Sequence, residues 1–306
     1  MTWPEGRRQT GSQNAMTEGH VSTPTVRRRR LGAKLRALHD VLGLTLEEVA
    51  EKSAGKITVA KLSRLETART AAKPDDVEML LSLYGVDDPE LQAALLALAS
   101  EGARRGWWHS YRGVLSPVYE DLISLEADAA SARSWQMGAI PGLLQTAEYA
   151  REIITTTAMS AAVEERVDAL VEVRLARQAV LTSRERPLDL CVIIAENALH
   201  TRCLGEGVMH DQLTRLHTLS RRPNITIQVM PPDAPPHVGQ MGSFSILGFN
   251  GHADLDVVHV ESLTSALYVE DGEQVGVYQD AFDRLRAAAL PAEASADRIA
   301  EIRKLA

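Results

Sequence analysis

The sequence predicts two domains of different fold class: an N-terminal all-α domain of five helices, and a larger α+β domain with a mixed sheet of about five strands. Two observations lead to this prediction. Up to about residue 99, apolar residues recur every three or four positions, which is the period of amphipathic helices. After Pro187 they alternate with polar residues or form short continuous runs, which is typical of strands. A length of 306 residues accommodates two domains of common size.

The expected domain boundaries follow changes in composition. Residues 1–25 are polar and show no apolar period, so we expect a disordered arm there. Residues 26–106 form the predicted all-α domain. The tryptophan pair at positions 107 and 108 marks the junction, and the α+β domain spans residues 107–306.

Capping signals place the helices of the N-terminal domain. The first predicted helix begins at Arg27, and Gly43 ends it because glycine accepts the left-handed conformation. Thr45 and Glu48 have the spacing of a capping box, which begins a short second helix. A third helix over residues 59–67, a fourth over 73–84 and a fifth over 90–99 complete the domain.

The second and third predicted helices, joined by a short turn that contains glycine, form a helix-turn-helix. Leu62 and Leu65 of the third helix face the core. The outer face of this region then presents Thr58, Ala60, Lys61 and Arg64. A helix exposed in this way fits the major groove of duplex DNA, so we expect it to read base edges.

The charge distribution supports contact with a polyanion at the N-terminal domain only. Residues 21–72 contain eleven Lys or Arg against five Asp or Glu, whereas the whole chain has a net charge of −8. A basic head on an acidic body indicates that only the head meets nucleic acid. Four consecutive arginines at 27–30 begin a helix, where the helix dipole disfavours cations, so we expect DNA phosphate to contact them.

Individual roles follow from side-chain chemistry. Arg64 can donate twice to a guanine edge, and Lys61 suits a base or a phosphate. Arg69 and Lys73 lie beyond the third helix and suit the DNA backbone. For Thr58 the alternative is a plain helix cap, and for Ala60 a solvent position. The candidate DNA-contacting residues are Thr45, Thr58, Val59, Ala60, Lys61, Arg64, Arg69, Lys73, Arg28 and Arg29.

The C-terminal domain is predicted to begin with helices and to continue with strands. The expected helices cover residues 117–136, 143–156, 161–183, 206–221, 273–289 and 293–305, and the expected strands cover 189–195, 224–230, 243–249, 256–261 and 266–270. The helix over 161–183 carries an apolar stripe, so we expect arginines such as Arg177 to point outward. The helix over 206–221 predicts a parallel crossover between the first two strands. Turns at Asn250-Gly251 and at 262–265 predict hairpins among the last three strands.

No catalytic, metal or cofactor site is predicted. Cys191 and Cys203 lack a metal-binding spacing, and no nucleophile elbow precedes a helix. The proline-rich loop over 231–239 is a candidate for an effector pocket or a partner contact, with a plain connector as the alternative. His237 and Gly239 of this loop, with Tyr268 of the last strand, are the candidate partner- or effector-binding residues.

The N-terminal segments resemble the Xre-type helix-turn-helix of phage and bacterial repressors. The similarity lies in Leu44-Thr45-Leu46-Glu47-Glu48-Val49-Ala50 and in Lys61-Leu62-Ser63-Arg64-Leu65-Glu66. It implies a DNA-binding domain over about residues 30–98. Members of that family usually pair an arginine with the glutamate at position 66, and this chain has His39 at the place of that arginine. We therefore expect Arg36 or Arg69 to substitute, and the turn is about two residues longer than usual.

The C-terminal domain resembles a family of antitoxin-like regulators that join an Xre head to one characteristic domain. The similarity rests mainly on Ile140-Pro141-Gly142-Leu143-Leu144-Gln145-Thr146-Ala147-Glu148-Tyr149-Ala150, with further matches up to residue 289. It implies a transcriptional regulator that pairs with a small protein from a neighbouring gene.

These observations together predict a sequence-specific, double-stranded-DNA-binding transcriptional regulator and no enzyme. We expect a homodimer, because such motifs bind paired half-sites. The two cysteines, and the lack of a signal peptide or an apolar membrane span, favour the cytoplasm. Two alternatives stay open: a one-component repressor that senses a small molecule in the C-terminal domain, and an antitoxin with autoregulatory DNA binding.

Overall fold

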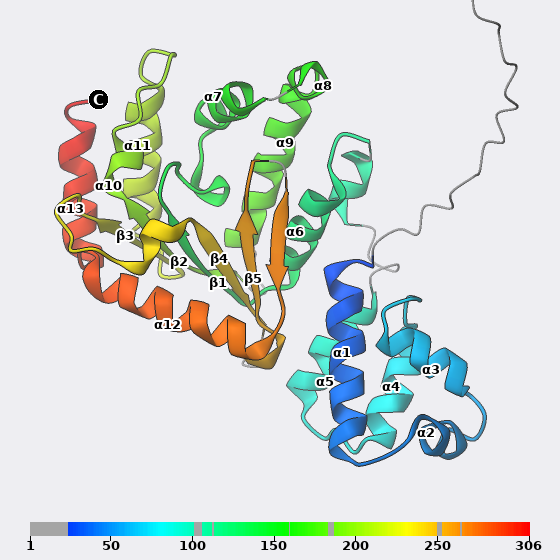
Figure 1. Cartoon of the computed structure of the whole chain (residues 1–306). Coiled ribbons are helices and arrows are strands. Elements are labelled where there is room, and N and C mark those ends of the chain that lie inside the picture. The colour runs from blue at the N-terminus through cyan, green and yellow to red at the C-terminus, as the bar shows by residue number, and fades with distance from the viewer. Residues whose placement is uncertain are drawn as a thin grey trace, which may run out of the picture.

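The computed structural model describes residues 24–100, 106–111, 113–158, 160–182, 187–249, 253–263 and 265–306. A small helical N-terminal domain lies beside a larger C-terminal domain built on a single sheet (Figure 1). The predicted arm over residues 1–25 lies outside the described residues, apart from its last two. No helix of the described segments is long and apolar enough to span a bilayer.

The N-terminal domain contains the five predicted helices: α1 (Val26–Val41), α2 (Leu46–Lys52), α3 (Val59–Glu66), α4 (Pro74–Leu83) and α5 (Pro89–Ala99). Thr45 and Glu48 form the predicted capping box, and Thr58 caps α3. Apolar side chains from every helix and from the turn form the core, including Leu35, Val49, Ile57, Leu62, Val77, Leu80 and Leu95. The helical periodicity therefore predicted this domain correctly.

Helices α1 and α3 approach each other closely at Gly32. A Cβ atom at this position would lie 2.6 Å from the carbonyl oxygen of Leu65 and 2.7 Å from that of Glu66. Both oxygens belong to the backbone of α3, so they cannot move aside cheaply. Any other residue at position 32 would push the last turn of α3 away from α1.

The C-terminal domain has one six-stranded mixed sheet. Its strands are β1 (Ser131–Gln136), β2 (Asp189–Ala195), β3 (Ile225–Met230), β4 (Phe244–Gly248), β5 (Val257–Glu261) and β6 (Ala266–Val269). They follow the order β3-β2-β1-β4-β5-β6. The β1–β2 and β2–β3 pairs are parallel, and the remaining pairs are antiparallel. The predicted crossover from β2 to β3 and the two predicted antiparallel pairings are confirmed.

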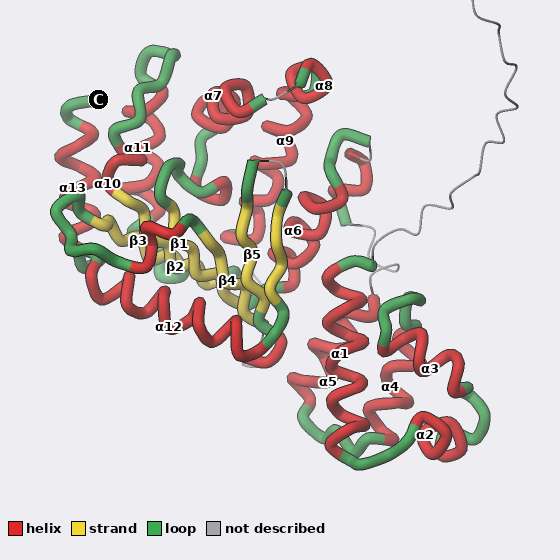
Figure 2. Tube along the Cα trace, viewed as in Figure 1, coloured by secondary structure: helices red, strands yellow, loops and turns green. Residues whose placement is uncertain are grey.

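Helices cover both faces of this sheet (Figure 2). They are α6 (Pro117–Asp128), α7 (Ala147–Thr157), α8 (Ala161–Glu164), α9 (Val167–Arg177), α10 (Glu196–Leu199), α11 (Val208–Leu219), α12 (Gly272–Ala288) and α13 (Ala292–Arg303). One face packs Trp135, Phe244 and Val258 against Phe282 and Leu285 of α12. On the opposite face, residues such as Val192 and Ile227 pack against α11. The alternation of strand side chains thus builds two apolar layers.

Two predicted helices of the C-terminal domain need correction. The helix expected over residues 117–136 ends at Asp128, and the segment after it forms β1, the sixth strand. This strand contains no β-branched residue, and its pairing on both sides with β2 and β4 stabilises it. The helix expected over 161–183 is broken at Glu165 and Arg166 into α8 and α9. The Asn250-Gly251 turn lies outside the described residues.

Candidate nucleic-acid interface

Helix α3 presents the predicted exposed face. Leu62 and Leu65 are buried against the bundle, whereas Ala60 and Arg64 are exposed. The Arg64 side chain makes no hydrogen bond or ion pair with any part of the chain that the structure describes. In Figure 1, α3 lies on the side of the N-terminal domain away from the C-terminal domain. The guanidinium of Arg64 is therefore available to an external acceptor.

The turn between α2 and α3 is built around the buried side chain of Ser53. Its hydroxyl donates to the carbonyl of Ala50 at 2.7 Å and accepts from the N–H of Ile57 at 3.0 Å. Ala54 and Gly55 follow with φ values of 52° and 79°. A left-handed pair of residues reverses the chain here, and it accommodates the extra length of the turn expected from the sequence.

Lys61 is less available than its position in the sequence predicts. Its Nζ lies 2.7 Å from Oδ1 of Asp76, which lies in the first turn of α4, and the Lys61 side chain is 34% exposed. The Asp76 side chain is itself only 12% exposed. Lys61 retains exposed surface for a phosphate, but it must exchange a protein carboxylate for that contact.

The remaining candidates in the helix-turn-helix occupy its rim. The exposed hydroxyl of Thr45 accepts from the N–H of Glu48, and that of Thr58 accepts from the N–H of Lys61 at 3.2 Å. Both threonines therefore cap helices. Arg69 and Lys73 are exposed beyond α3, and Val59 is half-buried.

His39 takes the place of the arginine expected opposite Glu66. Its Nδ1 lies 2.7 Å from Oε1 of Glu66, and both side chains are less than a tenth exposed. Burial raises the pKa of Glu66, and the neighbouring His39 opposes that rise. The expectation that Arg36 or Arg69 would substitute is therefore wrong, because His39 reaches the glutamate directly. The pair ties the last turn of α3 to α1.

The arginine run at the start of α1 faces the C-terminal domain. Arg29 Nη2 lies 2.6 Å from Oε1 of Glu270, and Arg27 pairs with Asp128. Because Glu270 already neutralises Arg29, a contact of Arg29 with DNA phosphate would require exchange of this carboxylate, and the contact stays a prediction. Arg28 is half-buried beside it, and its phosphate contact stays a prediction.

Arg30 is the most buried member of the run and stacks on an aromatic ring. Its guanidinium lies 4.2 Å from the ring centroid of Phe249, and the residue is 5% exposed. Neither of its terminal nitrogens has a hydrogen-bond partner among the residues placed by the structure. Burial lowers the pKa of Arg30 to about 10, although Glu270 and Asp256 lie near enough to oppose the shift.

The three candidate residues of the C-terminal domain do not form one site. His237 stacks edge-on against Trp135 at 5.5 Å, and the carbonyl of Gly239 accepts from the indole N–H of Trp135 at 2.9 Å. A Cβ atom at Gly239 would lie 2.6 Å from the same ring, so these two residues support the packing of Trp135. Tyr268 belongs to β6, three strands away from β1 in the sheet order.

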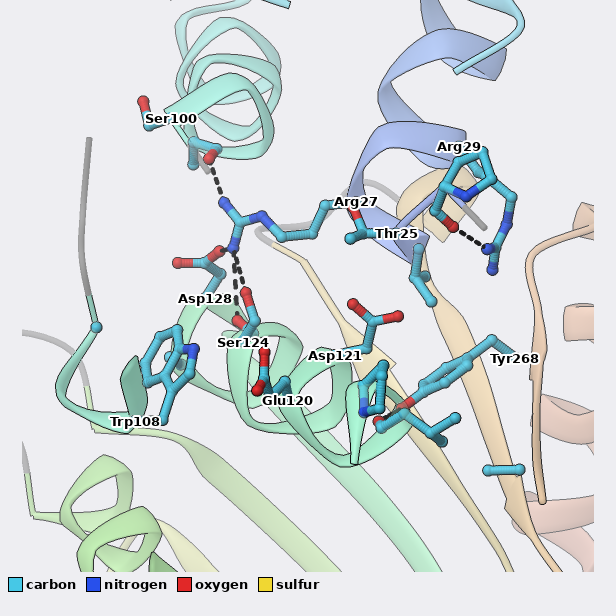
Figure 3. A pocket seen from close by; sticks show the side chains of 18 of the residues that line it. Thr25, Arg27, Arg29, Ser100, Trp108, Glu120, Asp121, Ser124, Asp128 and Tyr268 are labelled. Carbon is cyan, nitrogen blue, oxygen red and sulfur yellow. Dashed lines mark hydrogen bonds and ion pairs between the residues drawn. The ribbon is translucent and has the colours of Figure 1, made fainter. Parts of the chain in front are cut away.

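Tyr268 lines a cavity of about 960 Å³ where the two domains meet. Helices α1 and α5 contribute one wall, and α6 and β6 contribute the other (Figure 3). The phenol of Tyr268 donates to the carbonyl of Val118 at 2.7 Å, which fixes β6 against the first turn of α6. Of the three residues predicted to contact a partner or effector, His237 and Gly239 therefore pack against Trp135, and only Tyr268 lines the interdomain cavity.

Two family models match the chain. Residues 30–95 match a helix-turn-helix domain, and residues 119–301, more than half of the chain, match a domain of unknown function, DUF5753. The chain belongs to the DUF5753 family. No curated protein matches it. The helix-turn-helix match indicates a DNA-binding regulator, and residues 119–301 form the DUF5753 domain.

The segment over 140–150, on which the C-terminal resemblance rests, forms a buried polar network in the DUF5753 domain. Gln145 donates to the carbonyl of Ile140 at 2.6 Å and accepts from Arg174 at 2.9 Å. Gln178 donates to the carbonyl of Gln145 at 2.8 Å, and Gln212 accepts from the N–H of Thr146 at 2.7 Å. These contacts join the segment to α9 and α11, so its buried polar groups position these helices.

Arg177 is a second buried anchor of the DUF5753 domain, although the sequence predicts it to point outward. Its guanidinium donates to both carboxylate oxygens of Glu126, at 2.9 and 2.6 Å, and to the hydroxyl of Tyr119 at 2.6 Å. This bidentate pair joins α9 to α6. The prediction is wrong because α6 covers the face of α9 that its periodicity leaves polar.

Sequence reasoning also missed exposed cations in the turn region. Lys52 ends α2 and Lys56 lies in the turn, and both are exposed beside the N-terminus of α3. The signal was present, because the lengthened turn carries a lysine where the chain enters α3. Cys191 and Cys203 are free thiols, and no cluster of three or more metal-ligating side chains occurs within the described ranges.

Proposed function

We propose that this protein is a transcriptional regulator that binds double-stranded DNA in a sequence-specific manner by inserting α3 into the major groove. The observation that supports this most strongly is the exposed Arg64, unpaired among the described residues, in the last turn of a helix that faces away from the DUF5753 domain. Its planar fork suits the two acceptors of a guanine edge. Lys56 precedes this helix, Lys61 belongs to it, and Arg69 and Lys73 follow it; these cations suit phosphate.

The test compares one substitution on two DNA sequences. A duplex selected from a random pool by the wild-type chain serves as the specific site, and a scrambled duplex serves as the reference. We expect Arg64→Ala to weaken binding to the selected duplex by about 1–3 kcal/mol and to relax the base preference. Arg69→Ala, the matched control, should weaken binding to both duplexes alike. Equal losses on both duplexes for Arg64→Ala would exclude its base-reading role.

We propose further that the DUF5753 domain binds a small partner protein and thereby modulates DNA binding. The domain contacts the DNA-binding domain through charged residues at the start of α1, so a ligand of the one can act on the other. The protein encoded beside this gene is the partner to test, by DNA affinity with and without it. Growth inhibition by that protein alone, relieved by this chain, would identify an antitoxin instead.

We also propose that the regulator acts as a homodimer on paired half-sites. One recognition helix covers too little DNA for tight binding, and helix-turn-helix dimers read half-sites about 34 Å apart. Sedimentation of the chain with duplexes that carry one or two half-sites checks this. A single chain bound to each two-site duplex at saturation would contradict it.

A further inference from the structure

The interdomain cavity touches the edge of the sheet as well as its faces. Ala266, Leu267 and Tyr268 are consecutive residues of β6, and all three line the cavity. Side chains of consecutive strand residues point to opposite faces. A cavity that reaches all three therefore lies against the edge of the strand, where the backbone is accessible.

The hydrogen-bond register shows which backbone groups face the cavity. Ser262 N–H donates to the carbonyl of Ser265 at 2.8 Å, so these residues form a hydrogen-bonded pair at the end of the hairpin. Bonded and non-bonded pairs alternate along antiparallel strands. The pairs Glu261–Ala266 and His259–Tyr268 are then non-bonded, and the N–H and C=O groups of Ala266 and Tyr268 point away from β5.

These outward groups have no partner in the part of the chain that the structure describes. At the opposite edge of the same sheet, outward backbone groups of β3 do have hydrogen-bond partners. There the carbonyl of Val229 in β3 accepts from the N–H of Leu290 at 2.9 Å, and its N–H donates to the hydroxyl of Ser295 at 2.9 Å. One edge is closed by the C-terminal segment, whereas β6 is left open toward the DNA-binding domain.

The charge of the neighbouring wall indicates what kind of strand fits. The Tyr268 side chain points to the α6 face, where Glu120 and Asp121 also line the cavity (Figure 3). Glu120 forms no ion pair with any residue in the described ranges. On the other face of β6, Leu267 is 59% exposed. An added strand would meet the carboxylate of Glu120 on one side and the apolar side chain of Leu267 on the other.

We infer that the free edge of β6 binds an extended peptide segment of the partner protein, with basic residues toward α6 and apolar residues toward Leu267. This is strand addition, in which backbone hydrogen bonds provide affinity and alternate side chains provide specificity. The inference rests on the partner-binding part of the proposed function and deepens it. The same segment would contact α1 and α5, because these helices form the opposite wall of the cavity.

The probe is an acetylated, amidated peptide of alternating lysine and valine, about eight residues long. The full-length chain is titrated with it, and amide hydrogen exchange is followed at Ala266 and Tyr268. We expect saturable binding and slower exchange at both amides. A peptide in which glutamate replaces lysine should bind at least about tenfold more weakly, because it meets the carboxylates of α6.

A proline substitution tests the edge without breaking the hairpin. Ala266 is the first residue of β6 and its N–H points outward, so Ala266→Pro removes a donor from the free edge and no bond to β5. We expect Ala266→Pro to weaken peptide binding by about tenfold, and Ala266→Ser, which keeps the N–H, to change it little. Glu120→Lys should reverse the preference between the two peptides.

Three outcomes would overturn the inference: no saturable binding, equal binding by Ala266→Pro and Ala266→Ser, or a dimer of the chain that Ala266→Pro converts to a monomer. The last would show that a second copy occupies the edge. Binding of the selected duplex is measured on the same samples. Intact DNA binding without peptide binding rejects only this inference, whereas peptide binding without specific DNA binding rejects the proposed function.

Discussion

Two cationic surfaces of the N-terminal domain have opposite surroundings. The face of α3 carries Arg64, which is exposed and unpaired within the described residues. The start of α1 carries more cations, but Arg27 and Arg29 pair with carboxylates of the C-terminal domain. Local charge density alone would rank α1 as the better DNA contact. The difference teaches that the partner available in the fold decides which basic segment can bind phosphate.

The largest expected effect concerns the His39–Glu66 pair, which holds α3 against α1. His39→Leu removes the partner of Glu66 and leaves its carboxylate buried beside α1. We expect a loss of about 3 kcal/mol in the free energy of unfolding, because a buried charge without its partner is costly. Urea denaturation of the full chain measures it. The double variant with Glu66→Leu should recover part of the loss, and no recovery would show that the pair is not the cause.

A matched pair of arginines tests the comparison directly. Arg64→Ala should weaken specific DNA binding by about 2 kcal/mol, whereas Arg29→Ala should leave it nearly unchanged, because Glu270 neutralises Arg29. Fluorescence anisotropy on the selected duplex measures both. If Arg29→Ala weakens binding as much as Arg64→Ala, the start of α1 contacts DNA and must leave the C-terminal domain to do so.

A smaller effect is expected at Arg30, the most buried residue of the arginine run that faces the C-terminal domain. Arg30→Met replaces a guanidinium that has no hydrogen-bond partner for its terminal nitrogens by an apolar chain over Phe249. We expect the free energy of unfolding to rise by about 1 kcal/mol, since an unpaired buried cation is replaced by packing. Denaturation midpoints of the two chains provide the measurement. A decrease instead would show that Glu270 and Asp256 stabilise the cation.

The smallest expected effect concerns the Lys61–Asp76 ion pair beside the exposed face of α3. Asp76→Asn releases Lys61 from its ion pair, so we expect tighter binding to all duplexes and a salt slope steeper by about one unit. Affinity measured over a series of salt concentrations shows it. Glu78→Gln, an exposed carboxylate in the same helix, is the control for net charge. The same slope in both variants would mean that Lys61 gains no phosphate contact.

Local signals in the sequence predicted the helices of the N-terminal domain well. Thr45, Thr58 and Gly43 mark helix ends through contacts within a few residues, and α3 has the predicted buried and exposed faces. The runs of β-branched residues in β2, β3 and β5 are also local signals, and they predicted these strands. Strand β1 escaped prediction because its polar sequence is stabilised by the strands on both sides of it.

The ion-pair partner of a given charged side chain could not be predicted, because that partner is distant in the sequence. Lys61 pairs with a residue of the next helix, and Arg29 with one that lies 241 positions along the chain. The sequence shows that such residues are charged, but only the fold shows which of them meet. The outward orientation expected for Arg177 failed for the same reason.

The absence of a side chain at position 32 has a mechanical consequence. Helix α1 has 16 residues and is about 24 Å long. Its first turn contacts the C-terminal domain through Arg27, and Gly32 lies against the end of α3. Two rods in such close contact cannot pivot separately. A small tilt imposed at one tip of α1 is therefore transmitted as a change in the angle of α3, without any flexible segment between them.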